Sequence, residues 1–334
     1  MMRLKIIFSI VFLVAIYVAR GQDPLFTQSN YIQETLNPGF VGFEDNNRVY
    51  AGVVSRLQWP KLDLKLNTQY AFVNMAYDYG PGLGFGVGIN AIWQYETFSN
   101  YNYYQINAVY AHRVNLNNGW YFRPGIEVGV GNKSNRFRNL TLADQININT
   151  ETINPITIDP FFGNTINPFF LDVSAGLVFE KSEFRGTSYW FGASVKHLNR
   201  PNISFVEGEV LPLDIFYSVH GNYRFPFLMD HSVMMTVNYM QQSEYNRLDI
   251  GTIYQMDILL LGLTAVTNPA RNFQDSHLLT SINAFVGLEF DELRFGLSYD
   301  MNTSGISNTN GVYEVSVTYL SRCRSCSLNR RRKR

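Results

Sequence analysis

The chain closes with a run, 311-GVYEVSVTYL-320, in which apolar and polar side chains alternate. Successive side chains of a β-strand face opposite sides. One face therefore carries Tyr313, Val315, Val317 and Tyr319, and the other carries Glu314, Ser316 and Thr318. Such a two-faced segment fits either the core of a soluble antiparallel sheet or a lipid bilayer around a water-filled barrel.

The N-terminus favours export from the cytoplasm. Arg3 and Lys5 precede an apolar run over residues 6–18 that is broken only by Ser9, and Ala19 and Gly21 then supply small residues. This order is typical of a secretory signal peptide. The alternative, a transmembrane anchor, is disfavoured because the run is too short to cross a hydrocarbon core of roughly 30 Å. We therefore expect residues 1–21 to be a cleaved signal peptide and Gln22 to be the mature N-terminus.

Composition agrees with an exported β protein. Charged residues make up 16% of the chain and aromatic residues 15%, which is less charge than in a typical soluble domain. Tyrosine and phenylalanine suit both pleated surfaces and the aromatic girdles of membrane barrels. The formal net charge is zero, so composition gives no reason to expect a nucleic-acid partner.

Alternation and turn residues predict about fourteen strands, each close to the nine to eleven residues that cross a bilayer when tilted. Their expected bounds are 48–59, 67–77, 83–95, 103–114, 120–131, 170–180, 188–198, 213–225, 231–241, 245–256, 258–267, 278–290, 293–301 and 312–320. An even number is what a closed bacterial barrel requires. We therefore predict an all-β fold, a transmembrane antiparallel β-barrel.

The connections between the predicted strands differ in length. The alternation is lost over residues 133–168, which we predict to be a long loop with room for a short hairpin, and again over 199–212. Short connections at 241–245 and 290–293 alternate with longer ones, as in outer-membrane barrels. If the N-terminus and the tail are periplasmic, the two long loops face outside. A secreted soluble sandwich or propeller is the alternative, although no blade-length repeat is found.

Residues that carry catalysis are scarce. No metalloprotease, phosphate-loop or nucleophile-elbow motif occurs, and the glycines of 82-GLGFGVG-88 fall within a predicted strand and do not open a helix. The histidines are scattered over separate strands. We therefore predict no enzyme activity, no catalytic residue, no cofactor and no metal site.

Charged residues on the polar strand faces are expected to point into the lumen of a barrel. They are Asp172, Glu180, Arg294, Asp300 and Glu314. A lumen lined by charge either conducts water or is closed by something that pairs with the charge, and the sequence leaves both open.

The basic tail, residues 321–334, contains both cysteines. Cys323 and Cys326 are too few for a zinc site on their own, and no histidine lies near them. A local disulfide, a redox role and a flexible tail without chemistry are the alternatives.

Two blocks of residues, one at each end of the mature chain, resemble the PorP/SprF family of type IX secretion system outer-membrane proteins. The N-terminal block comprises Gln22, Asp23, Pro24, Phe26, Thr27, Gln28, Leu36, Asn37, Pro38, Gly42, Arg56, Gln58 and Trp59. The C-terminal block comprises Leu297, Ser298, Tyr299, Asp300, Asn302, Tyr313 and Glu314. The sequence departs from the family pattern at Ile32, at residues 39–41 and in the tail.

The resemblance implies a multi-pass β-barrel in the outer membrane of a Gram-negative bacterium, in contact with its lipid. It implies type IX secretion components as partners, together with a secreted surface protein that carries a C-terminal sorting domain, such as a gliding adhesin. Residues 22–47 form the segment before the first strand. Pro24 and Pro38 bar regular ladder pairing there, so the segment is either an ordered non-strand element in the barrel or a plain lead-in.

Three functional hypotheses follow. The first is a non-enzymatic barrel that supports secretion or cell-surface attachment of a partner protein. The second is an outer-membrane transport barrel, either porin-like or substrate-specific, suggested by the charged inner face. The third is a soluble secreted binding module.

Overall fold

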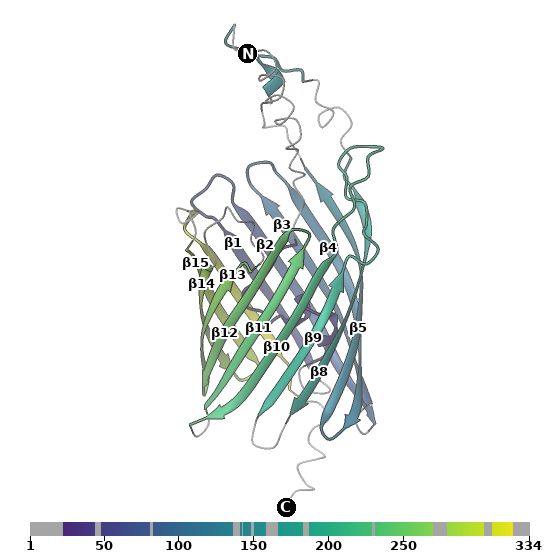
Figure 1. Cartoon of the computed structure of the whole chain (residues 1–334), viewed down its shortest axis with the longest axis vertical. Helices are drawn as coiled ribbons and strands as arrows, with labels where there is room; N and C mark the ends of the chain where they lie inside the picture. Colours follow the sequence, from purple (N-terminus) through teal and green to yellow (C-terminus); the bar gives the residue numbers. More distant parts are fainter. Residues whose placement is uncertain are drawn as a thin grey trace, which may run out of the picture.

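The protein is a closed antiparallel β-barrel of fourteen strands (Figure 1). The computed structural model describes residues 23–43, 48–80, 83–135, 141, 143–147, 150–157, 166–182, 187–228, 231–269, 279–303 and 309–322. The expected signal peptide, Gln22, Cys323 and Cys326 lie outside the described residues. No helix within the described ranges is long and apolar enough to cross a membrane.

The barrel strands agree closely with the bounds expected from alternation. They are β1 (Val49–Gln58), β2 (Leu66–Gly80), β3 (Leu83–Glu96), β4 (Asn102–Asn117), β5 (Trp120–Ser134), β8 (Phe169–Ser182), β9 (Ser188–Lys196), β10 (Phe216–Phe227), β11 (His231–Gln242), β12 (Tyr245–Met256), β13 (Leu259–Thr267), β14 (Leu279–Phe290), β15 (Leu293–Asn302) and β16 (Val312–Leu320). Strands β6 (Ile146–Asn147) and β7 (Thr152–Ile153) form a separate hairpin inside the connection from β5 to β8, as expected.

The barrel closes where the last strand pairs with the first. Strand β16 runs antiparallel to β1, and Glu314 lies directly opposite Arg56 in this register. Closure leaves the barrel without an edge strand, so each of its fourteen strands pairs with a neighbour on both sides, as a bilayer demands. The prediction of a transmembrane barrel is therefore confirmed.

The two faces of β16 have opposite environments. Tyr313 is 42% exposed on the outer wall and Tyr319 is 45% exposed there, whereas Glu314 is only 1% exposed inside the barrel. The apolar wall faces the lipid, and the polar side chains fill the lumen. Of the two environments that fit the pattern of 311–320, the structure shows the wall of a membrane barrel.

The two ends of the barrel differ in their connections. At one end, here the short-turn end, the strands are joined through 81–82, 118–119, 183–187, 228–230, 257–258 and 291–292. At the other end, the long-loop end, the joins include 135–168 and 197–215. The connection 243–244 also lies at the long-loop end, but it is short. A tight turn is possible there because Ser243 adopts a positive φ of 53°.

One predicted strand begins later than expected. Alternation placed its start at residue 213, but β10 begins at Phe216. Leu213 instead donates its backbone N–H to the carbonyl of Pro201, and its side chain packs beside Ile203 and Phe170. The connection 197–215 thus folds back on itself before β10 starts.

The barrel interior is occupied by residues 23–43, here called the lumenal segment. It begins near His197 and Gln242 at the long-loop end and reaches Gly86 near the short-turn end. Two 3-10 turns, η1 (Gln33–Thr35) and η2 (Pro38–Phe40), form its middle. Asn37 caps η2 by accepting the N–H of Gly39 at 2.8 Å, and proline at the first helical position needs no donor partner. The segment is therefore an ordered element inside the barrel.

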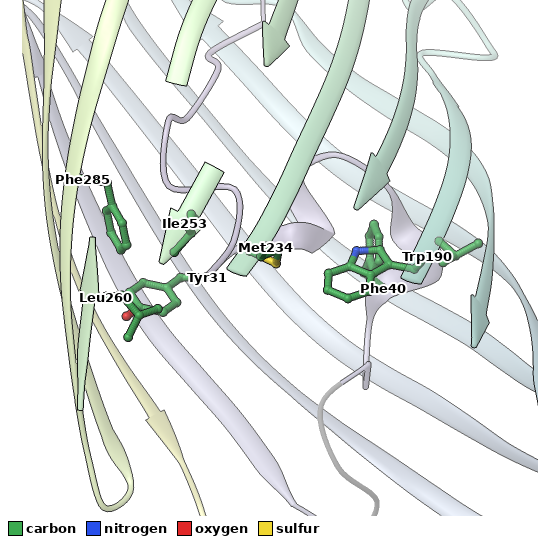
Figure 2. Close-up of a cluster of buried hydrophobic side chains, with 8 residues drawn as sticks. Tyr31, Phe40, Trp190, Met234, Ile253, Leu260 and Phe285 are labelled. Atoms are coloured by element: carbon green, nitrogen blue, oxygen red, sulfur yellow. The ribbon is translucent and has the colours of Figure 1, made fainter. Parts of the chain in front are cut away.

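Apolar side chains of the lumenal segment pack against the inner wall. Figure 2 shows Phe40 beside Trp190, and Tyr31 beside Leu260 and Phe285. The ring centroids of Tyr31 and Phe285 are 5.6 Å apart in an edge-to-face arrangement. Most other side chains inside are polar, so this small core is surrounded by hydrogen bonds and ion pairs.

Candidate functional site

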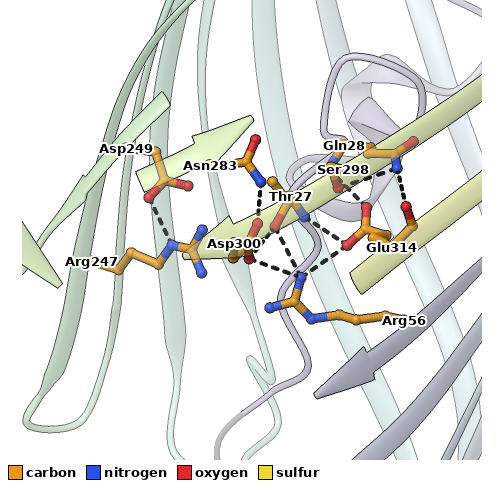
Figure 3. A network of polar contacts seen from close by, with 9 residues as sticks. All are labelled: Thr27, Gln28, Arg56, Arg247, Asp249, Asn283, Ser298, Asp300 and Glu314. Carbon is orange, nitrogen blue, oxygen red and sulfur yellow. Dashed lines mark hydrogen bonds and ion pairs between the residues drawn. The ribbon is translucent and has the colours of Figure 1, made fainter. Parts of the chain in front are cut away.

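The first half of the lumenal segment is held by a buried carboxylate at the seam between β1 and β16 (Figure 3). Glu314 accepts the backbone N–H of Thr27 at 3.0 Å and that of Gln28 at 2.9 Å. The guanidinium of Arg56 donates to the same carboxylate at 2.9 Å. One side chain of β16 therefore connects the other seam strand and the lumenal segment at a single point.

Neighbouring side chains extend this network. The Gln28 amide donates to the backbone oxygen of Glu314 at 2.9 Å, and the Thr27 hydroxyl donates to Asp300 at 2.8 Å. Asn283 donates to the other oxygen of Asp300. Burying charges in a dry environment is costly unless each is paired and hydrogen-bonded. Because the lumenal segment supplies several of these partners, it is energetically coupled to the charged wall.

The second half of the segment is held by close backbone approach. The Asn37 amide donates to the carbonyls of Leu177 at 2.9 Å and Ala193 at 3.0 Å. A Cβ atom built on Gly176 would lie 2.1 Å from the Asn37 Oδ1 atom, and one on Gly125 would lie 2.4 Å from the backbone nitrogen of Gly39. Only glycine allows the wall to approach this closely.

Strand β3 uses glycine in the same way. A Cβ atom on Gly86 would lie 2.1 Å from the carbonyl oxygen of Val41, and Gly42 itself adopts a positive φ of 65°. Gly86 and Gly88 therefore make room for the lumenal segment inside the barrel.

Arg123 fixes the end of the segment near the short-turn end. Its Nε donates to the carbonyl of Gly39 at 3.0 Å, and its Nη2 donates to that of Val41, also at 3.0 Å. Its Nη1 lies 3.7 Å from the carboxylate of Glu180. The buried cation thus satisfies backbone carbonyls that η2 leaves unpaired.

The start of the lumenal segment contacts the wall at the long-loop end. His197 follows β9, and its ring nitrogens lie 2.8 Å from Asp23 and 2.9 Å from Asp172. Burial disfavours the charged imidazole, but the two carboxylates outweigh it and raise the pKa of His197 to about 9. Burial also opposes ionisation of Asp23, and the imidazolium nevertheless holds the pKa of this carboxyl well below its usual range.

The structure brings the two family blocks together in part. Thr27, Gln28 and Arg56 meet Ser298, Asp300 and Glu314 in one network (Figure 3). Asp23, Phe26, Leu36, Asn37, Pro38 and Gly42 contact the inner wall elsewhere. Pro24, Gln58, Trp59 and Asn302 line a cavity at the long-loop end. Leu297, Tyr299 and Tyr313 lie apart from the network because they occupy the outer face.

All five charges that were expected in the lumen lie there. Asp172, Glu180, Asp300 and Glu314 are buried, and Arg294 lies 3.5 Å from Glu289. Two of these charges, Asp300 and Glu314, pair with the lumenal segment. Sequence reasoning missed Arg123 and His197. The available signal for Arg123 was a charge in the lumen-facing phase of β5, the phase that also holds Gly125, Gly129 and Gly131.

Two cavities remain on either side of the segment. One of about 370 Å³ lies at the short-turn end, and one of about 390 Å³ lies at the long-loop end. Within the described ranges, no group of three or more His, Cys, Asp or Glu side chains could hold a metal ion.

These features define a class: a transmembrane β-barrel with an apolar outer wall and a lumen occupied by its own N-terminal segment. The family model of the type IX secretion system membrane protein PorP/SprF matches residues 18–319. The chain therefore belongs to the PorP/SprF family of type IX secretion system membrane proteins. With its closed barrel it resides in the outer membrane, which confirms the localisation inferred from the resemblance.

Solved barrels are similar to the chain at low sequence identity. A TodX monoaromatic hydrocarbon channel mutant, deltaS2S3, is 11% identical, with a TM-score of 0.47 over 89% of this chain and 94% of that one. The CdiB protein from Acinetobacter baumannii is 7% identical, with a TM-score of 0.45 over 82% and 60%. A KdgM porin in complex with disordered oligogalacturonate is 10% identical, with a TM-score of 0.37 over 81% and 98%. No curated protein matches the chain.

Proposed function

We propose that the protein supports secretion or cell-surface attachment of a partner protein, such as a gliding adhesin with a C-terminal sorting domain, by protein–protein contact and without catalysis. The observation that carries this proposal is the occupied lumen. Thr27, Gln28 and Arg56 converge on a buried carboxylate, so the interior is committed to holding the chain's own segment. The surfaces left for partners are the connections at the two ends.

Export of the chain rests on residues 1–21 being a cleaved signal peptide. N-terminal sequencing of the protein purified from outer membranes tests this step. A mature chain that begins at Gln22 supports the proposal, and a chain that retains residues 1–21 contradicts it.

Deletion of the gene tests the role in secretion. We expect at least one type IX substrate to be lost from the cell surface, measured by mass spectrometry of surface-shaved peptides, and to return when the wild-type gene is restored. The matched control is complementation with Gly221→Ala, within strand β10, where the nearest atom to an added Cβ would be 4.0 Å away. An unchanged set of surface substrates in the deletion strain would contradict the proposal.

A transport barrel is the second candidate, and the two cavities that flank the lumenal segment favour it. Conductance in planar bilayers separates the two functions. The proposed function predicts a sealed barrel in the absence of partners, because the lumenal segment is held at both the seam and the opposite wall. A steady open pore under the same conditions would favour transport.

A further inference from the structure

The cavity at the short-turn end, here the short-turn cavity, is rich in positive charge. Its lining includes Arg113, Arg224 and Arg294, against two acidic residues, Glu180 and Glu289. Lys181 also borders the cavity, but its ammonium lies over aromatic rings in the outward-facing phase of the strands. Arg113 pairs with Glu180 at 2.8 Å, and Arg294 lies 3.5 Å from Glu289. The lining therefore carries an excess of one positive charge, because three guanidinium groups face two carboxylates.

The cavity at the long-loop end does not share this bias. Among its lining residues, Arg56 and Arg247 are balanced by Asp23 and Asp300. The two cavities are similar in volume, so the difference lies in charge and not in space. An excess of positive charge at one end of the lumen attracts anions to that end.

Two buried polar groups on the wall of the short-turn cavity have no hydrogen-bond partner among the described residues. They are the hydroxyl of Tyr31, a residue 3% exposed, and the indole Nε1 of Trp190, a residue 6% exposed. An indole N–H can only donate, and a phenol can donate. A buried donor without an acceptor costs free energy, so both positions favour an incoming acceptor.

The location of the cavity indicates where its ligand comes from. Lys181 and Ser188 flank the turn after β8, and Glu289 and Arg294 flank the turn after β14. Short turns of outer-membrane barrels face the periplasm. Apolar side chains, among them Phe43 and Leu260, share the lining with the cations. A mixed apolar and cationic wall suits a peptide that carries carboxylates more than a small inorganic anion.

We propose that the short-turn cavity binds an acidic peptide segment of a periplasmic partner protein. This inference rests on the proposed function, in that the barrel works through protein contact, and it adds the chemistry of one contact. Asn30, Tyr31, Gln33 and Phe43 of the lumenal segment form part of the cavity wall. A bound peptide therefore touches the lumenal segment directly and stabilises it in place.

Peptide binding to the full-length protein in lipid nanodiscs tests the inference. The probe is fluorescein-labelled hexaglutamate followed by anisotropy, with labelled hexaglutamine and hexalysine as matched controls. We expect saturable binding of hexaglutamate alone. Arg224→Gln should weaken it about tenfold, and Trp190→Phe, which keeps an aromatic ring but removes the N–H, should weaken it several-fold. Arg200→Gln, at the long-loop end with a half-exposed side chain, should leave it unchanged.

Heat-resistant migration of each variant on semi-native gels shows that the barrel is folded. Equal binding of hexaglutamine, or unchanged binding in folded Arg224→Gln and Trp190→Phe, would overturn the inference. Complete displacement of the peptide by inorganic phosphate at millimolar concentration would also overturn it, because the site would then be a free-anion site. Loss of surface substrates on gene deletion without any peptide binding would leave the proposed function standing and remove only this inference.

Discussion

The two halves of the lumenal segment are held in different ways. Residues 27–31 meet the seam of the barrel through charge, because Glu314 accepts two backbone N–H groups and the Arg56 guanidinium. Residues 37–41 meet the opposite wall through close packing against glycines of β3, β5 and β8, supported by hydrogen bonds from Asn37 and Arg123. Each buried charged or polar group needs a partner of its own, whereas a close backbone approach needs only a residue without a Cβ atom. The two halves should therefore respond to different perturbations.

The largest effect is expected at the charged half. Glu314→Ala leaves the buried guanidinium of Arg56 and two N–H groups without their acceptor, which should lower the free energy of unfolding by about 3–5 kcal/mol. Urea unfolding in nanodiscs measures this change. Glu292→Ala, at a pair that includes the exposed Arg322, is the control and should cost less than about 1 kcal/mol.

A double variant sharpens this prediction. Replacing the pair by Arg56→Met and Glu314→Leu removes both charges, so most of the lost stability should return. Recovery should be incomplete, because the N–H groups of Thr27 and Gln28 still lack an acceptor and buried Asp300 loses its ion pair with Arg56. A loss below about 1 kcal/mol in Glu314→Ala would show that the seam network does not stabilise the barrel.

The second effect is a pH dependence at the start of the segment. The pKa of His197 is raised to about 9 between Asp23 and Asp172. Its contribution to the free energy of unfolding is therefore fully present below its unfolded pKa of about 6.5 and is lost as pH rises through 9. The loss should amount to roughly 3 kcal/mol at most. The Asp23 carboxyl, whose pKa is lowered, contributes in the opposite sense, and its share is lost only in acid.

The urea midpoint at pH 6, 7.5 and 9 measures this dependence. The decline of the urea midpoint with rising pH should be smaller in His197→Gln. It should be retained in His112→Gln, at a residue beside Tyr110 on the outer wall. A decline that is identical in His197→Gln would assign the titration to another group. Lys133 and Lys196 also act electrostatically on Asp23 and lower the pKa of its carboxyl.

The smallest effect is expected at the close-packed half. Gly125→Ala places a Cβ atom 2.4 Å from the backbone nitrogen of Gly39 and should cost about 1–3 kcal/mol through overpacking. The control is Gly221→Ala, whose nearest atom would be 4.0 Å away, with an expected change within about 0.5 kcal/mol. Equal unfolding curves for both variants would show that close approach at β5 does not position the segment.

Sequence alone predicted the strands of the barrel better than the contacts inside it. Strand positions follow from a period of two residues, which is local, and the same period placed Asp300 and Glu314 in the lumen. The contact between Thr27 and Glu314 joins residues 287 positions apart, and no local pattern encodes such a contact. His197 looked like one scattered histidine because its two carboxylate partners come from distant parts of the chain.

The course of the lumenal segment sets an order of events in assembly. It passes from the long-loop end to the short-turn end and then continues into β1, so the chain is threaded through the ring that its own strands form. Because β16 completes that ring beside β1, residues 23–43 must already lie across the sheet when the last strands join, or must slide in lengthwise afterwards. A folded domain placed ahead of Asp23 would therefore stay at the long-loop end of the barrel.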